Sequence, residues 1–122
     1  MNSPQLLNNK FNLNADKRFY FAGQMTGVEG YVESAASGLM AGLHAAREAL
    51  GLEAVEFPAE TAHGALANYI SNPAVKEFQP MNINFGLIPP LTQRIRKKRE
   101  KNAMIAARAL EILDVVKAKY EL

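Results

Sequence analysis

The chain has 122 residues, of which 48% are hydrophobic and 21% charged, and its formal net charge is +2. This size and composition are typical of one globular domain, and the absence of cysteine excludes disulfides, thiolate metal sites and a cysteine nucleophile on these residues. The first residues are polar and no apolar run is long enough to cross a bilayer, so we expect a cytoplasmic protein without membrane contact.

The first half of the chain predicts one strand followed by one long helix. Residues 1–18 have no periodic pattern, and the apolar run Phe19–Ala22 predicts a short buried strand. Helical character begins between Gly27 and Gly30 and extends to Leu50, where Gly51 is a suitable terminating residue. Small residues recur every fourth position on this helix, at Ser34, Gly38, Gly42 and Ala46. Such a face packs closely against another element, and a single strand cannot cover it, so we expect these residues to be part of a larger protein.

The second half predicts two further helices joined by a linker. A short helix over Glu60–Ser71, entered at Pro58 or Ala59, ends before Asn72-Pro73. Residues 72–91 form the linker, with an extended stretch in which apolar and polar residues alternate around Ile83. A last helix is predicted from Thr92 to near Tyr120. Its apolar stripe consists of Ile105, Ala109, Ile112, Leu113, Val116 and Tyr120, so its second half must pack on another part of the protein.

Positive charge is concentrated immediately before and within the start of this last helix. Residues 94–101, here called the basic segment, have a net charge of +5, whereas residues 1–93 have −3 and residues 102–122 are neutral. The cations of the basic segment are Arg94, Arg96, Lys97, Lys98, Arg99 and Lys101. A cluster of this kind suits a phosphate-bearing partner such as RNA, and a solvated face or ion pairs explain it equally well from sequence alone.

The junction between the predicted strand and the long helix has the features of a cofactor-binding turn. Glycines at 23, 27 and 30 let another molecule approach the backbone, and the mouth of the helix offers free N–H groups and a favourable dipole to an electron-rich ligand. Tyr31 is placed to stack on a planar ligand, although local packing explains it as well. An ordinary tight turn is the alternative for the glycines, because short glycine motifs are weak evidence.

A longer motif favours the interpretation of this turn as a cofactor-binding one. Residues 21–38 read Phe-Ala-Gly-Gln-Met-Thr-Gly-Val-Glu-Gly-Tyr-Val-Glu-Ser-Ala-Ala-Ser-Gly, and residues 78–87 read Phe-Gln-Pro-Met-Asn-Ile-Asn-Phe-Gly-Leu. With Asn2-Ser3-Pro4 and Phe57-Pro58, these motifs resemble the C-terminal part of the folate- and FAD-dependent tRNA (uracil-5-)-methyltransferases, the TrmFO family, which is related to the GidA-type flavoproteins. The resemblance covers essentially the whole chain.

The resemblance implies a mostly helical C-terminal fragment of an α/β, Rossmann-type FAD enzyme, with one short core strand and three helices. Residues 1–56 would complete the FAD-binding domain, and residues 57–122 would form a helical C-terminal region. The parent would methylate C5 of a T-loop uridine in tRNA with methylenetetrahydrofolate, FAD and NAD(P)H. The basic segment would face the tRNA, and the positions matching the flavin and folate face are Gly23, Gln24, Gly27, Val28, Glu29, Gly30 and Tyr31.

Two parts of that family's machinery are absent from these residues. The chain contains neither the Gly-x-Gly-x-x-Gly fingerprint for the FAD pyrophosphate nor a cysteine to attack the uracil, so we expect the isolated chain to be inactive and to self-associate through exposed apolar surface. His44 and His63 lack further ligands at metal-binding spacing, so no metal site is expected. Two alternatives remain: a fragment of the flavoproteins that modify wobble uridines with carboxymethylaminomethyl groups, and a non-catalytic helical RNA-binding module.

Overall fold

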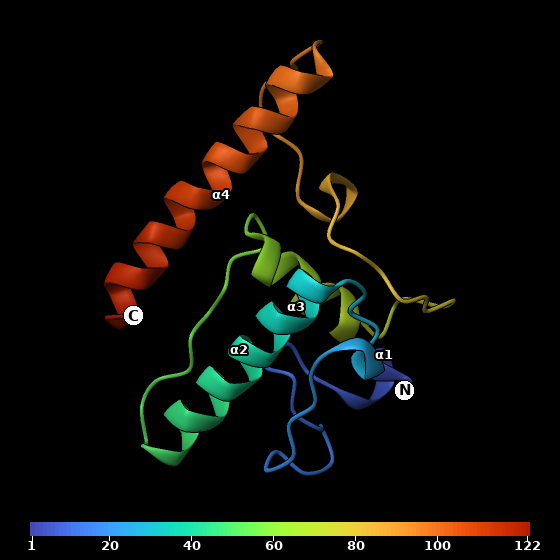
Figure 1. Ribbon diagram of the computed structural model, residues 1–122, viewed down its shortest axis with the longest axis vertical. Coiled ribbons are helices and arrows are strands. Elements are labelled where there is room, and N and C mark those ends of the chain that lie inside the picture. Colours follow the sequence, from blue (N-terminus) through green and yellow to red (C-terminus); the bar gives the residue numbers. More distant parts are fainter.

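The protein is mostly helical and contains no β-sheet. The computed structural model describes all residues, 1–122, and has four α-helices, α1 (Ser3–Leu6), α2 (Tyr31–Ala49), α3 (Ala62–Ser71) and α4 (Lys98–Tyr120). Two short 3-10 helices, η1 (Gln24–Thr26) and η2 (Phe85–Leu87), lie in the connections. In Figure 1, α2 and α3 pack near α1 in the lower half of the molecule, and α4 runs diagonally beside them with much of its length apart. No helix has the length and apolar character that crossing a membrane requires.

The expected strand at Phe19–Ala22 does not form. Only Tyr20 of this run makes a bridge, an isolated antiparallel one with Asn12, and the Phe21 N–H donates to the Phe11 carbonyl at 2.8 Å. Phe19 is 53% exposed because no neighbouring strand covers it. The apolar run therefore lacks the sheet that its composition requires, and the prediction of one core strand with three helices is replaced by four helices without a strand.

Helix α2 confirms the predicted long helix and its end. Its last turn closes on Gly51, whose N–H donates to the Glu48 carbonyl at 3.1 Å, and the Leu52 N–H donates to the Arg47 carbonyl at 2.8 Å. These bonds satisfy carbonyls that a helix end leaves free. The helix buries only one face, which carries Ser37, Met40, Ala41 and His44.

Helix α3 forms the centre of the larger core. It begins two residues later than predicted, because the Thr61 hydroxyl caps it by accepting from the Gly64 N–H at 3.0 Å, and it ends before Asn72-Pro73 as expected. A side chain at Gly64 would collide with the backbone of Pro58, so close packing requires glycine there. The core cluster comprises Leu7, Phe11, Val28, Met40, Ala41, Leu66, Ala67 and Ile70.

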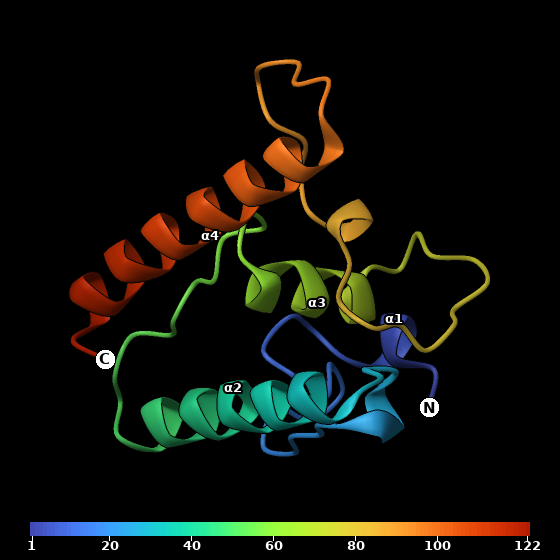
Figure 2. The same ribbon diagram turned by 45° about the horizontal axis from the view of Figure 1, so that its top comes forward.

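Helix α4 begins at Lys98, six positions after the predicted Thr92. The chain after Pro89-Pro90 instead forms a loop that projects beyond the first turn of α4 in Figure 2. Arg108 holds the base of this loop to the helix by donating to the carbonyls of Pro89 and Pro90. The second half of α4 docks as predicted, because Val116 and Tyr120 are buried in a small second cluster with Val55.

Candidate functional site

The glycine turn folds through its own short hydrogen bonds. The carbonyl of Gly23 accepts from both the N–H of Thr26, at 3.0 Å, and its hydroxyl, at 2.7 Å, which closes η1. The Gly23 N–H donates to the Ser37 hydroxyl of α2 at 2.8 Å, and the Ser3 hydroxyl donates to the Thr26 carbonyl at 2.6 Å. The turn is thereby fixed from two directions, by α1 and by the buried face of α2.

A distant segment supports the turn from outside. Val28 and Met81 form an isolated parallel bridge in which the Met81 N–H donates to the Gly27 carbonyl at 2.9 Å and the Glu29 N–H donates to the Met81 carbonyl at 3.0 Å. The side-chain amide of Asn82 donates to the Glu29 carbonyl at 3.1 Å. From the sequence, residues 78–87 were part of the family resemblance but were not predicted to lie at the site. The alternation of apolar and polar residues around Met81 and Ile83 was the sign that this segment is extended.

Two glycines of the turn adopt conformations that a side chain would disturb. Gly27 has φ of +96° and Gly30 has φ of +101°. A Cβ on Gly27 would overlap the ring of Phe78, and a Cβ on Gly30 would overlap Glu33 and the amide of Asn82. Both glycines are therefore needed for the backbone path and for the closeness of the supporting segment.

The N-terminus of α2 has backbone N–H groups without hydrogen-bond partners. Gly30 precedes the helix without a side-chain cap, and the N–H groups of Tyr31, Val32 and Glu33 donate no hydrogen bond within the protein. Tyr31 is 97% exposed, so its ring has no packing partner in this chain. One expected donor is not free, because the Glu29 N–H is used by Met81. Val28 is fully buried, backbone included, and Gly27 beside it is buried as well.

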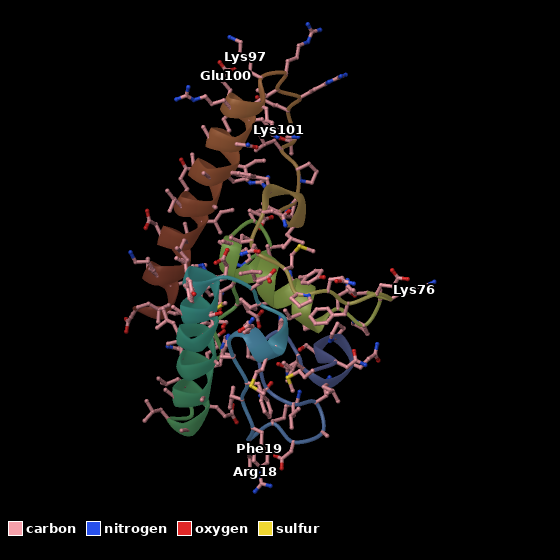
Figure 3. All side chains as sticks on the ribbon, turned by 45° about the vertical axis from the view of Figure 1, so that its right-hand side comes forward. Arg18, Phe19, Lys76, Lys97, Glu100 and Lys101 are labelled. Carbon is pink, nitrogen blue, oxygen red and sulfur yellow. The ribbon has the colours of Figure 1, made fainter.

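The basic segment is a separate surface. All six of its cations are exposed, and none forms an ion pair. Arg94, Arg96 and Lys97 lie in the loop before α4 and not in its first turns, so the macrodipole opposes fewer cations than the sequence suggested. Figure 3 shows Lys97 and Lys101 at one extremity of the molecule, far from the glycine turn near α1.

Three of these cations share a hollow of about 520 Å³ with apolar side chains. Arg96, Lys98 and Lys101 line it together with Phe85, Ile88 and Ile95. Cations beside an exposed aromatic ring are the combination used to bind single-stranded nucleic acid, through phosphate contacts and base stacking. Phe85 was part of the resemblance but was not predicted as a site residue.

The two histidines pack around one aromatic ring. His44 meets Phe57 edge-on with centroids 6.0 Å apart, and His63 stacks on the same ring at 5.4 Å. Burial lowers the pKa of both imidazoles, and for His44 the charges of Lys10 and Arg47 contribute further, to about 4. No group of histidine, aspartate and glutamate side chains is arranged to hold a metal ion.

Comparison with known proteins identifies the family. Residues 1–53 match the family model described as glucose inhibited division protein A. The chain is 56% identical over 117 residues, 96% of its length, to a protein of Lactiplantibacillus plantarum named methylenetetrahydrofolate–tRNA-(uracil-5-)-methyltransferase TrmFO. Proteins of the same name are 57% identical over 92% of the chain in Enterococcus faecalis and 51% identical over 98% in Acetivibrio thermocellus. The chain belongs to the TrmFO family.

It represents only part of a TrmFO protein. The chain spans 26% of the L. plantarum and E. faecalis relatives and 28% of the A. thermocellus relative. The small-residue face of α2 agrees with this, because Gly38 and Gly42 are exposed and nothing lies within 4 Å of a Cβ at either position. The self-association expected from such surface, and the domain boundary near residue 56, stay predictions.

Proposed function

We propose that these residues form the part of a TrmFO enzyme that borders the flavin and folate and contributes to tRNA contact. The whole enzyme would transfer a methylene carbon from methylenetetrahydrofolate to C5 of a T-loop uridine and reduce it to a methyl group with FAD and NAD(P)H. The chain alone, without a glycine fingerprint or a cysteine, would be inactive.

The observation that carries this proposal is the fixed, donor-rich turn at the mouth of α2. Three free N–H groups, at Tyr31, Val32 and Glu33, point from a helix start whose dipole favours negative charge. A Cβ on Gly23 would meet nothing within 4 Å, so another molecule has room to approach that backbone. Free donors and open backbone fit the polar edge of a flavin ring.

Each predicted residue then has a distinct task. FAD, when bound, supplies the electrons that convert the methylene carbon to a methyl group. Gln24, which is exposed and makes no side-chain hydrogen bond here, would bind the ribityl or phosphate region. The amides at the start of α2 would orient the ring, and Tyr31 would cover a planar pteridine lying over it. Gly27, Val28, Glu29 and Gly30 would hold this backbone in place through Met81 and Asn82.

The remainder of the enzyme would complete the surfaces that this chain leaves open. We propose that Phe19–Ala22 becomes a strand of a Rossmann-type sheet when the neighbouring strands are present, and that the face of α2 with Gly38 and Gly42 packs against that sheet. The exposure of Phe19 and of both glycines supports this. The basic segment would lie on the tRNA side, since its cations are exposed and unpaired.

A chimeric enzyme tests the flavin assignment. The matching quarter of the L. plantarum relative would be replaced by this chain, with Gln24→Ala in one version and Gln93→Ala in the other. Both glutamines are exposed, but Gln93 lies in the loop before α4. We expect Gln24→Ala to lower retained FAD, measured by absorbance of the purified protein, by about tenfold, the scale of one lost hydrogen bond to a charged group. Equal flavin content in the two variants would remove Gln24 from the site.

A further inference from the structure

A second hollow, here called the apolar hollow, adjoins the one that three cations of the basic segment line. Its volume is about 340 Å³, and it lies between η2, the first turn of α3 and the middle of α4. Figure 2 shows the gold η2 above α3 and beside the N-terminal end of α4. Every residue of the lining except Asn84 is apolar. The two hollows share Phe85, Ile88 and Ile105, so they form one continuous depression with a cationic end and an apolar end.

The walls of the apolar hollow are accessible from outside. Phe85 is 45% exposed and Leu110 is 63% exposed, and Ala106 beside them is exposed as well. Ile105 is only 2% exposed and forms the floor. An open, concave apolar surface is typical of a binding site, because burying it against an apolar or planar group is favourable. A bound group can therefore contact these side chains directly.

The charges around the depression select the chemistry of the partner. Arg96, Lys98 and Lys101 line the cationic end, and none of them forms an ion pair. No carboxylate lines either hollow. A partner that fits both ends must combine negative charge with a planar or apolar group. A nucleotide of RNA does so, because its phosphates suit the cations and the face of its base suits an aromatic ring.

Only an unpaired nucleotide can use both ends. An RNA helix presents 2′-hydroxyls and base edges in its open groove, and an apolar lining would leave these polar groups without partners. The one polar residue of the lining is already engaged: Asn84 Oδ1 accepts from the Gly86 N–H at 2.9 Å, and its amide donates to the Asn82 carbonyl at 3.2 Å. The apolar hollow therefore suits the face of an unstacked base and does not read its edge.

We propose that this depression binds one unpaired RNA nucleotide, with its base stacked on Phe85 in the apolar hollow and its phosphates at the cationic end. The proposal rests on the RNA-facing role proposed above for the basic segment, and adds that the contact requires a base outside a helix. Because recognition is by stacking, the larger ring of a purine should bind more tightly than a pyrimidine. No residue of the lining is a nucleophile or an acid, so this is a recognition contact and not the place of methyl transfer.

Fluorescence anisotropy with the 122-residue protein tests this with four blunt-ended RNA duplexes. One is fully paired, and the others have a single bulged adenosine, a bulged uridine or a bulged abasic ribose at the same position. The three bulged RNAs have the same phosphates and differ only in the base. We expect the adenosine bulge to bind about tenfold more tightly than the abasic one, the scale of one stacked base, with uridine between them.

Two outcomes separate this proposal from the role of the basic segment. Equal affinity for the adenosine and abasic bulges would overturn the base site and leave the RNA surface in place, and the apolar hollow would then suit an apolar side chain of a protein partner. Absence of binding to any of the four RNAs would overturn both proposals.

A matched pair of variants on α4 locates the base. Ala106 and Ala107 are both exposed, but only Ala106 lines the apolar hollow. Ala106→Leu should fill the hollow and abolish the preference for adenosine over abasic ribose. It should leave the affinity for the abasic RNA unchanged, because no charge is lost. Ala107→Leu should keep the tenfold preference.

A third variant tests the stacking ring itself. Phe85→Leu keeps an apolar side chain but removes the aromatic face, so the preference for adenosine should fall. Circular dichroism of the three variants checks that they fold, and the comparison of RNAs with the unmodified protein does not depend on any variant. The same preference in Ala106→Leu and Ala107→Leu would show that the base binds elsewhere and would overturn the proposal.

Discussion

The glycine turn and helix α4 are held to the protein in different ways. The turn is fixed by buried packing and by hydrogen bonds from α1, α2 and the segment around Met81. Helix α4 is attached by Arg108 near its middle and by Val116 and Tyr120 near its end, and most of its surface is exposed. A rigid turn is suited to positioning a cofactor, whereas an exposed charged helix start is suited to a large, flexible partner such as RNA.

The largest expected effect is on the turn itself. Gly27→Ala should lower the free energy of unfolding by about 3 kcal/mol, because alanine at φ of +96° is strained and its Cβ displaces the Phe78 ring. Urea denaturation of the 122-residue protein measures this. Gly38→Ala is the control: its Cβ enters open space in a helix and should stabilise by about 0.5–1 kcal/mol. Similar stability of the two variants would show that the turn is not tightly packed.

The second largest expected effect is the loss of folding stability on acidification, through His44. The pKa of His44 is about 4 in the folded protein against 6.5 for the free side chain, so the unfolded chain binds more protons between these values. The stability this group provides is complete above pH 6.5 and is lost as the pH falls toward 4. Between pH 7 and pH 5 the loss should be about 2 kcal/mol.

Urea denaturation at the two pH values, in phosphate-free buffer, measures this for the wild type and for His44→Gln. The variant should lose about 2 kcal/mol less than the wild type, because glutamine does not titrate. His63, whose pKa is also lowered by burial, remains in both proteins and contributes to both in the same direction. An unchanged pH dependence in His44→Gln would show that the imidazole is as easily protonated in the folded protein as in the unfolded one.

The sequence predicted helices where local rules determine them. Gly51 ended α2 and Asn72-Pro73 ended α3, because these residues act through their own backbone. The structure of the run 19–22 and the start of α4 depend on contacts between segments distant in the sequence. Phe19–Ala22 needs neighbouring strands that this chain does not contain. Residues 92–97 stay outside α4, in a loop whose base Arg108 binds through the carbonyls of Pro89 and Pro90.

The candidate site was predictable in its contiguous part only. The glycine turn and its residues were found from a motif of eighteen successive residues, 21–38. The support from Met81 and Asn82 joins segments that are distant in the sequence. No local periodicity records such pairings, so a single sequence did not reveal them.

The basic segment should affect RNA binding and leave stability unchanged. In a filter-binding assay with a T-arm stem-loop RNA, the double change Arg96→Gln and Lys101→Gln should weaken binding about tenfold and reduce the salt slope by about 0.7–0.9 per lost contact. The control, Lys17→Gln with Lys76→Gln, removes the same charge elsewhere. Equal losses in the two double variants would mean that only net charge matters, and the basic segment would then not be a specific RNA surface.

The smallest expected effect concerns the attachment of α4. The Tyr120 hydroxyl accepts from the Glu56 N–H at 3.2 Å, and the ring is 7% exposed. Tyr120→Phe keeps the ring packed but leaves that N–H without its acceptor, so the free energy of unfolding should fall by about 1 kcal/mol. The control Tyr31→Phe should change nothing, because the Tyr31 hydroxyl has no partner in this chain.

Amide hydrogen exchange separates a local effect from a global one. If α4 is held independently of the turn, Tyr120→Phe should speed exchange in the last turns of α4. The amides of Gly27 and Met81 should stay protected, because they lie beside Val28, which belongs to the other core cluster. Equal acceleration at Gly27 would instead mean that the two regions open together. The rigidity of the turn would then depend on the docking of α4.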